Sequence, residues 1–192
     1  MNPDQVLKIF RETRALLSGH FELRSGLHSD QYFQCALVQQ HPRIAEKLCA
    51  AAVDKMKAVL GAKLTVDAVI SPALGGIPVG HEVGRALDVR AIFAEKQEGK
   101  LVLRRAFEVG KGEHFVVAED VMTRGGRIQE TIDIVTGRGG IVEAVLVLVD
   151  RSGGKAQFPY PVFSLLKLEP ATWEPDKCPL CKSGSKAVHP GS

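Results

Sequence analysis

An apolar strand, a pair of carboxylates, a glycine turn and a helix follow one another without interruption near the middle of this chain. Phe115–Ala118 has the apolar character of a buried strand, and Glu119 and Asp120 stand where that strand ends. Gly125–Gly126 then form a turn, after which apolar residues recur at helical spacing. This order of elements is that of a βα unit, and it predicts an α/β fold.

The residues of this segment suit a sugar phosphate. The unpaired backbone N–H groups at the start of a helix attract an anion, and glycines at positions 125 and 126 let the backbone approach it. Glu119 and Asp120 accept hydrogen bonds from ribose hydroxyls or face a hydrated metal ion. The alternative is an ordinary βα turn with solvated carboxylates. Neither G-x-x-x-x-G-K-[ST] nor a G-x-G-x-x-G motif after a strand is present.

Strands and helices alternate through most of the chain, which predicts a central, mostly parallel sheet with helices on both faces. Ligands of such sheets bind beyond the carboxyl ends of the strands, so the loops 71–76, 95–100, 119–127 and 150–152 are expected to converge. The expected elements are a helix at 3–18, two short strands joined around Ser25–Gly26, a helix at 42–61, a strand at 66–70, a helix at 77–87, and strands at 90–94, 115–118 and 141–149.

Size and charge narrow the class of protein. A chain of 192 residues suits one domain with a small appendage. The net charge of +3, with no run of five basic residues, argues against nucleic-acid binding. No apolar stretch has membrane-spanning length, and residues 1–5 lack the features of a signal peptide, so we expect a cytoplasmic protein with no membrane partner.

Two of the four cysteines form a C-x-x-C pair, Cys178 and Cys181, in a segment rich in Pro, Lys, Ser and Gly from residue 169 onward. One such pair supplies half of a four-ligand zinc site, with His189 or a second subunit as the source of the rest. A loosely packed, flexible tail is the favoured interpretation. Cys35 and Cys49 are interpreted as small, partly buried apolar residues.

Four motifs together resemble those of the type I phosphoribosyltransferases, and among these the orotate phosphoribosyltransferases. They are residues 21–29 with Tyr32 and Phe33, residues 71–78, residues 115–127, and residues 146–151 ending in Asp150-Arg151. The resemblance implies the type I phosphoribosyltransferase fold with a small N-terminal hood. It divides the chain into a domain at 1–168, with the hood at about 19–40 and the core at about 41–168, and the polar tail at 169–192.

The resemblance also assigns site residues. It implies that phosphoribosyl pyrophosphate (PRPP) is bound by Glu119, Asp120, Val121, Met122, Thr123, Arg124, Gly125, Gly126 and Arg127. It implies that orotate is contacted by Thr123, Arg151, Tyr32 and Phe33, since an Arg fork suits a planar anion. His28 matches a hood position that is Lys in many relatives and touches phosphate.

Lys96 and Lys100 match loop lysines that reach the pyrophosphate across a homodimer interface, and they are the predicted catalytic residues. The loop departs from the common pattern, with Glu95, Val102 and Gly75 where relatives often have Arg, His and Lys. Arg104 or Arg105 is a candidate to supply the missing charge.

The reaction implied by the resemblance joins orotate to PRPP and releases pyrophosphate, in pyrimidine biosynthesis. Magnesium would be carried by PRPP near Glu119 and Asp120 rather than held by ligands of its own. Two alternatives remain open at this point. One is a phosphoribosyltransferase for another base, and the other is a PRPP-sensing regulator without turnover.

Overall fold

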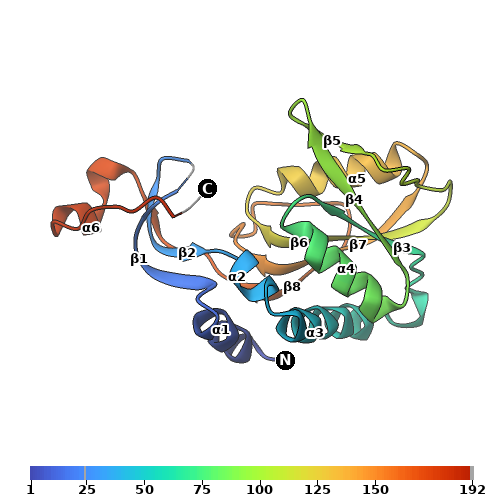
Figure 1. The fold of residues 1–192 in the computed structure, drawn as a ribbon, viewed down its shortest axis with the longest axis horizontal. Coiled ribbons are helices and arrows are strands. Elements are labelled where there is room, and N and C mark those ends of the chain that lie inside the picture. Colours follow the sequence, from blue (N-terminus) through green and yellow to red (C-terminus); the bar gives the residue numbers. More distant parts are fainter. Residues whose placement is uncertain (24, 191–192) are drawn as a thin grey trace.

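The computed structural model describes residues 1–23 and 25–190. Arg24, which belongs to the hood motif, lies outside the described residues. Within these ranges, no helix is both long enough and apolar enough to cross a membrane. The fold consists of a six-stranded sheet with helices on both faces and a three-stranded sheet that stands apart from it (Figure 1).

The larger sheet has the strand order β5-β4-β3-β6-β7-β8. All neighbouring strands are parallel except β5, which forms an antiparallel hairpin with β4. This confirms the α/β class with a mostly parallel central sheet. The strands are β3 (Ala68–Pro72), β4 (Arg90–Gln97), β5 (Lys100–Leu103), β6 (His114–Met122), β7 (Ile141–Asp150) and β8 (Val162–Lys167).

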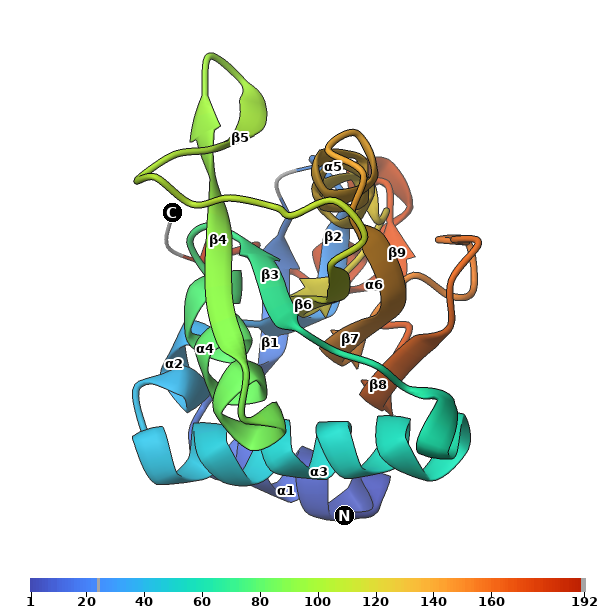
Figure 2. The same cartoon turned by 90° about the vertical axis from the view of Figure 1, so that its right-hand side faces the viewer.

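Helices cover the two faces of this sheet unequally. α3 (Pro42–Leu60), α4 (Gly76–Leu87) and α1 (Pro3–Glu12) lie on one side, and α5 (Gly126–Thr136) lies on the other (Figure 2). Successive side chains of β6 point to opposite faces of the sheet, so they pack into two separate apolar clusters. Val116 and Ala118 join the apolar cluster of the three helices, whereas Phe115 and Val117 join that of α5. The strand that carries the acidic pair is therefore held from both faces.

Of two helices predicted from the sequence, one is confirmed and the other ends earlier than expected. The helix expected at 42–61 is confirmed as α3, with Pro42 in its first turn and Gly61 at its end in a positive-φ conformation. The helix expected at 3–18 is wrong beyond Glu12. Thr13 caps α1 and Arg14 has a φ of 57°, which turns the chain out of the helix toward the next strand. β8 lies outside the predicted elements.

The three-stranded sheet is the hood. β1 (Leu16–Glu22) and β2 (His28–Phe33) form the predicted hairpin, and β9 (Thr172–Trp173) pairs with the other edge of β2. Val188 bridges to Phe21 on β1, so the C-terminal segment reaches both edges of the hairpin. The prediction of a loosely packed tail is therefore wrong. Between these contacts lie a 3-10 turn at Pro175–Lys177 and the short helix α6 (Pro179–Lys182).

Candidate active site

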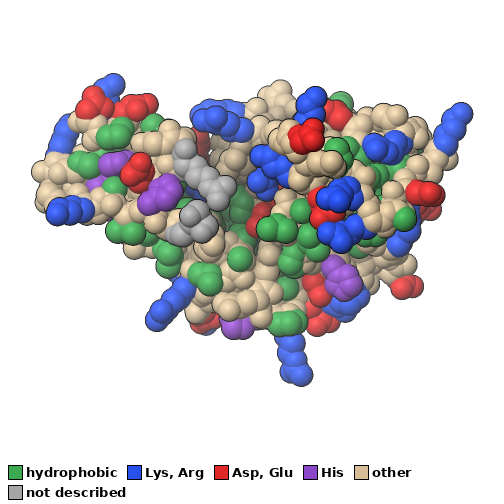
Figure 3. Space-filling view, turned by 45° about the horizontal axis from the view of Figure 1, so that its top comes forward, with side chains coloured by type: hydrophobic (Ala, Val, Ile, Leu, Met, Phe, Trp, Pro, Cys, Tyr) green, Lys and Arg blue, Asp and Glu red, His purple; other side chains and the backbone are tan. Residues whose placement is uncertain are grey.

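Three neighbouring cavities lie beyond the carboxyl ends of β3, β4, β6 and β7. The middle one, of about 190 Å³, is lined by Glu119 and residues 121–128, which include every predicted PRPP residue except Asp120. It shares Thr123 and Arg124 with a cleft of about 730 Å³ toward the hood. It shares Arg127 with a cavity of about 380 Å³ toward the β4–β5 hairpin. Lys and Arg side chains gather around the hollow between the hood and the core (Figure 3).

The turn before α5 is built to leave its amides exposed. Gly125 is the N-cap residue of α5 and has a φ of 78°, and a Cβ there would lie 2.8 Å from Cζ of Phe158. Only glycine fits this backbone and this close approach. Among the described residues, no side chain caps the helix. Its first amides are therefore available to an anion, at the positive end of the helix dipole.

Burial favours the protonated form of Glu119 in the acidic pair. Glu119 is 4% exposed, and its Oε1 accepts a hydrogen bond from the Asp120 amide at 3.1 Å. Burial and then the charge of Asp120 raise the pKa of Glu119 to about 9. Asp120 Oδ1 accepts a hydrogen bond from the Val121 amide at 2.7 Å. A Glu119 carboxyl group that keeps its proton can donate a hydrogen bond to a ribose hydroxyl as well as accept one.

The loop after β3 presses against the acidic pair. A Cβ at Gly75 would lie 2.6 Å from Asp120 Oδ2, and one at Gly76 would lie 3.0 Å from Glu119 Oε1. The Gly75 carbonyl accepts a hydrogen bond from Gln39 Nε2 at 3.1 Å, in the short helix α2 (Ala36–Gln39). A larger side chain at position 75 has no room unless Asp120 moves. The close approach of Asp120 therefore favours glycine at this position.

Arg151 lies at the seam between core and hood. Its guanidinium carbon is 5.1 Å from the centre of the Phe33 ring, in cation–π contact. Its Nε is buried and finds no hydrogen-bond partner among the residues that the structure describes. Burial lowers the pKa of the Arg151 guanidinium. A partly buried cation with a free donor above an aromatic ring is suited to a flat, anionic ligand.

The same hood-side cleft contains all the residues predicted to contact orotate. Tyr32, Phe33, Thr123 and Arg151 line it together. The cleft is also lined by Leu23, Ser25 and Leu27 of the hood motif at 21–29 and by Ser152 of the loop at 150–152, two segments that were expected near the site. Four further lining residues had no signal in the sequence: Lys155, Glu169, Pro170 and Thr172. Lys155 and Glu169 form an ion pair of 3.7 Å between the loop after β7 and the start of the tail.

Known proteins are similar to this chain over most of its length. A family model described as the phosphoribosyl transferase domain matches residues 36–180. Proteins named orotate phosphoribosyltransferase from Heliobacterium modesticaldum and Carboxydothermus hydrogenoformans are 52% and 50% identical to this chain. The alignments cover 100% and 97% of this chain, and 99% and 96% of those proteins. The chain belongs to the orotate phosphoribosyltransferase family.

A solved structure confirms the predicted type I phosphoribosyltransferase fold. The orotate phosphoribosyltransferase of Aeropyrum pernix matches with a TM-score of 0.69 at 25% identity. The match covers 85% of this chain and 94% of that one.

The two loop lysines lie on opposite faces of the β4–β5 hairpin. Lys96 pairs with Leu101, and Gln97 pairs with Lys100. Because paired residues share a face of an antiparallel hairpin, Lys96 and Lys100 point to opposite sides. Lys96 and Leu101 line the third cavity together with Gly75 and Arg127, whereas Lys100 is exposed and lines none of the three cavities. The structure therefore brings Lys96, but not Lys100, to this chain's own cleft.

The structure places Arg105 and His28, two residues that the sequence analysis connected with phosphate or pyrophosphate, away from a free position in the cleft. Arg105 forms hydrogen bonds of 2.9 and 2.8 Å with Glu95, so its charge is already paired. His28 was assigned to phosphate contact, and that assignment is wrong in this structure. The side chain is buried against His20 in the hood, and it lines none of the three cavities.

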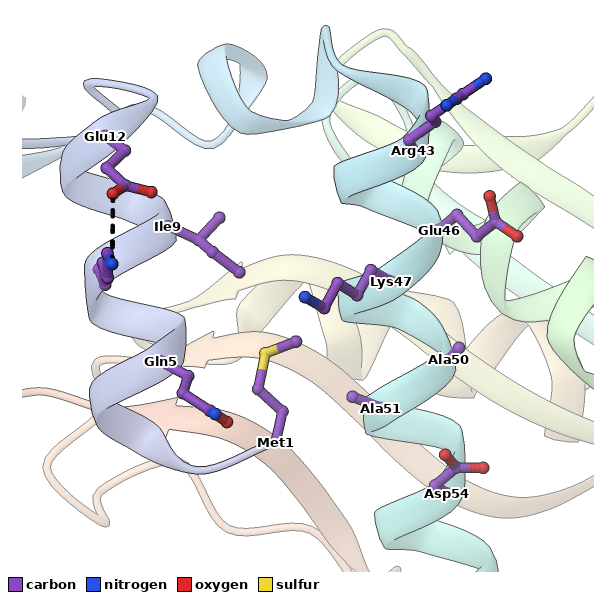
Figure 4. A pocket seen from close by; sticks show the side chains of 11 residues that line it. Met1, Gln5, Ile9, Glu12, Arg43, Glu46, Lys47, Ala50, Ala51 and Asp54 are labelled. Atoms are coloured by element: carbon purple, nitrogen blue, oxygen red, sulfur yellow. Dashed lines mark ion pairs between the residues drawn. The ribbon is translucent and has the colours of Figure 1, made fainter.

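A fourth cavity, of about 700 Å³, lies between α1 and α3 (Figure 4). Its wall is largely charged, and Lys8 and Glu12 form an ion pair of 3.8 Å along α1. It shares no residue with the three cavities at the sheet edge. Ligands of open α/β sheets bind beyond the strand ends, so this cavity is not the candidate active site.

Proposed function

We propose that orotate and PRPP react in the three connected cavities, giving orotidine 5′-monophosphate and pyrophosphate, a step of pyrimidine biosynthesis. The observation that carries this proposal is Arg151, a partly buried guanidinium whose buried Nε has no partner among the described residues, at the point where the hood meets the phosphate-binding turn. Orotate is planar and carries a carboxylate. A base without that anion would leave this partly buried cation unpaired.

PRPP occupies the middle cavity in this proposal. The amides of residues 123–127 hold the 5′-phosphate, and the charges of Arg124 and Arg127 flank it. Glu119 and Asp120 bind the ribose hydroxyls, and Val121 and Met122 continue the strand that positions the pair. The positively charged turn and the acidic pair thus recognise opposite ends of one phosphoribosyl group.

Orotate fills the hood-side cleft. Arg151 pairs with its carboxylate, Thr123 contacts the ring edge, and the rings of Tyr32 and Phe33 cover the flat face. Phe33 already stacks with Arg151, so the aromatic surface and the cation are preorganised as one unit. No base catalyst is needed, because the ring nitrogen of orotate ionises readily.

Catalysis rests on neutralising the leaving pyrophosphate and on excluding water. Lys96 lines the cavity beside Gly75 and serves this chain's own site. Lys100 points to the other side of the hairpin, which fits a residue that completes the site of a partner subunit in a homodimer. Closure of the hairpin over bound PRPP would bring these charges to the pyrophosphate.

The residues fit magnesium that arrives with PRPP. Asp120 Oδ1 is engaged by the Val121 amide, while Oδ2 faces Gly75, which lines the pyrophosphate-side cavity. A carboxylate oxygen in this place suits the water shell of a hard cation. When bound, magnesium screens the charge of the pyrophosphate. The four free cysteines are consistent with a reducing, cytoplasmic location.

The test is turnover with a panel of bases. Purified protein is mixed with PRPP, magnesium and either orotate, uracil or hypoxanthine, and product is followed by absorbance and chromatography. We expect orotidine 5′-monophosphate from orotate alone. Preferential use of uracil or hypoxanthine would contradict the assignment of Arg151. Binding of PRPP without turnover of any base would instead indicate a regulator, an outcome that the departures at Gly75 and Val102 make worth including.

A further inference from the structure

Four side chains from opposite ends of the chain meet inside the hood. His20, His28, Cys178 and Cys181 place one ligand atom each within 4.8 Å of all the others. His20 and His28 are 6% and 8% exposed, and Cys178 is fully buried, while Cys181 is partly exposed. None of the four lines the three cavities of the candidate active site. The cluster is therefore separate from the reaction.

Local backbone features bring these side chains together. β1 has one extra residue relative to β2 between Ser18 and Phe21, a bulge that directs His20 toward His28, with ring centres 4.8 Å apart. Cys178 precedes α6, and the Lys182 amide donates to its carbonyl at 3.2 Å. This turn brings Cys181 to the same side as Cys178.

The tautomer of a neutral His20 can be assigned from its neighbour. His20 Nδ1 lies 3.1 Å from the carbonyl oxygen of Ser185, which only accepts hydrogen bonds. Nδ1 therefore carries the proton, and the lone pair of Nε2 faces the cluster. A backbone carbonyl that fixes the tautomer in this way is typical of a metal-binding histidine. His28 Nδ1 faces the same point, 2.9 Å from His20 Nε2.

Three nitrogen–sulfur separations in the cluster are close to those of a tetrahedral site. In a tetrahedral zinc site, bond lengths of about 2.0–2.1 Å to nitrogen and 2.3 Å to sulfur place nitrogen and sulfur ligands about 3.6 Å apart. Here His20 Nε2 lies 3.5 Å from Cys178 Sγ and 3.7 Å from Cys181 Sγ. Cys181 Sγ lies 3.3 Å from His28 Nδ1. The two nitrogens, 2.9 Å apart, would move away from each other, and the widest separation, within 4.8 Å, would shorten when one ion binds all four atoms.

We propose that His20 Nε2, His28 Nδ1, Cys178 Sγ and Cys181 Sγ bind one structural zinc ion that fastens the C-terminal segment to the hood. Two thiolates and two imidazoles are the preferred ligands of zinc and fill its four positions, leaving none for a substrate. Binding releases the thiol protons and yields a complex without net charge. This inference does not depend on the proposed reaction.

The proposed zinc ion would stabilise the hood, which has few apolar contacts of its own. Phe21 is buried but belongs to neither apolar cluster of the core, so the outer part of the hood has little apolar packing of its own. The tail pairs through Thr172 with Ser29 and through Trp173 with His28. Thr172 lines the proposed orotate cleft. A metal at His28 therefore holds one wall of that cleft in place, as structural zinc does in small domains that lack a large core.

Metal content is the primary test. The full chain, produced without a metal-affinity tag, is dialysed and analysed by inductively coupled plasma mass spectrometry. We expect one zinc ion per chain, and loss of nearly all of it in Cys181→Ser and His28→Gln. Cys49→Ala, a buried free cysteine outside the cluster, is the matched control and keeps its zinc. After replacement by cobalt, the wild type should show the visible bands of tetrahedral thiolate coordination.

Limited proteolysis tests the structural role. Lys177, Lys182 and Lys186 are exposed sites for trypsin around the cysteine pair. Stripping the metal with a chelator should accelerate cleavage there by at least tenfold, and added zinc should restore protection. The wild-type chain alone gives this result, so the test stands if a variant does not fold. A wild type that neither contains nor takes up zinc, or a Cys181→Ser variant that retains it fully, overturns the proposal.

Discussion

The two halves of the cleft, to which we assign PRPP and the base, are built in different ways. The proposed PRPP half is one continuous segment, residues 119–127, at the end of a strand packed on both faces by apolar clusters. The base half is assembled from β2, the loop after β7 and the start of the tail, joined by the Arg151–Phe33 stack and the Lys155–Glu169 ion pair. The PRPP half is thus preorganised by the core, whereas the base half depends on how the hood is held.

This difference predicts that substitutions will separate into two kinetic classes. Changes in the core segment and its hairpin should alter PRPP handling and the rate of the chemical step. Changes where the hood meets the core, as at Arg151 and Phe33, should alter the use of orotate and leave PRPP binding intact.

The largest effect is expected for Lys100→Ala. Loss of a cation that stabilises the leaving pyrophosphate should lower kcat by roughly 100- to 1000-fold, because such groups act mainly in the transition state. PRPP affinity, measured by calorimetry, should change little. Lys63→Ala, an exposed lysine far along the chain from the hairpin, is the control. Near-normal kcat for Lys100→Ala would remove this residue from the catalytic set.

Arg151→Ala should come next. Removing the charged partner of the orotate carboxylate should lower kcat/KM for orotate by roughly 10- to 100-fold, since hydrogen bonds to charged groups contribute about 1.5–3 kcal/mol. KM for PRPP should stay close to that of the wild type. Arg151→Lys keeps the charge without the planar fork and should be intermediate. Equal damage to both substrates would show that Arg151 is structural, and the two halves would no longer be separable.

Gly125→Ala tests the preorganised turn. A side chain at a φ of 78° and 2.8 Å from the Phe158 ring should lower the free energy of unfolding by about 1–3 kcal/mol and weaken PRPP binding. Gly126→Ala is the matched control for stability, since a Cβ there meets no atom within 4 Å. Urea denaturation measures both variants. Equal stability of the two would mean that the turn is not constrained by Gly125.

The last prediction concerns the pH dependence of stability through Glu119. A carboxyl group whose pKa rises on folding, here to about 9 from an ordinary value of 4.5, holds its proton more tightly in the folded state. Its contribution to stability is complete below pH 4.5 and is lost as the pH rises toward 9. Glu119→Gln should therefore flatten the decline of the urea midpoint over this range. Asp133→Asn, an exposed acid on α5, should leave the decline unchanged.

The contiguous features were predictable because short-range patterns determine them. The strand, acidic pair, glycine turn and helix at 115–136 lie in one stretch, so hydrophobic period and turn residues suffice to identify them. The helix expected at 3–18 failed because its apolar pattern continues past Arg14, where the backbone turns out of the helix. Such a turn depends on the packing of β1 and leaves no mark on periodicity.

The hood cluster could not be predicted because its parts are far apart in the sequence. His20 and Cys178 are separated by 158 positions, and only the fold brings them to 3.5 Å. The C-x-x-C pair gave half of the set, and His189 was the wrong candidate for the remainder. Its ring contacts the Glu22 carbonyl at 3.1 Å and lies outside the cluster. The roles of Lys155 and Thr172 in the cleft were hidden for the same reason.

The central claim is that orotate and the phosphoribosyl group occupy adjoining halves of one cleft. A crystal structure with orotate, PRPP and magnesium, soaked into Lys100→Ala to slow turnover, tests it most directly. The account predicts the orotate carboxylate on Arg151, its ring against Phe33, and the 5′-phosphate on the amides of residues 123–127. Orotate bound away from Arg151, or PRPP bound in the cavity between α1 and α3, would contradict it.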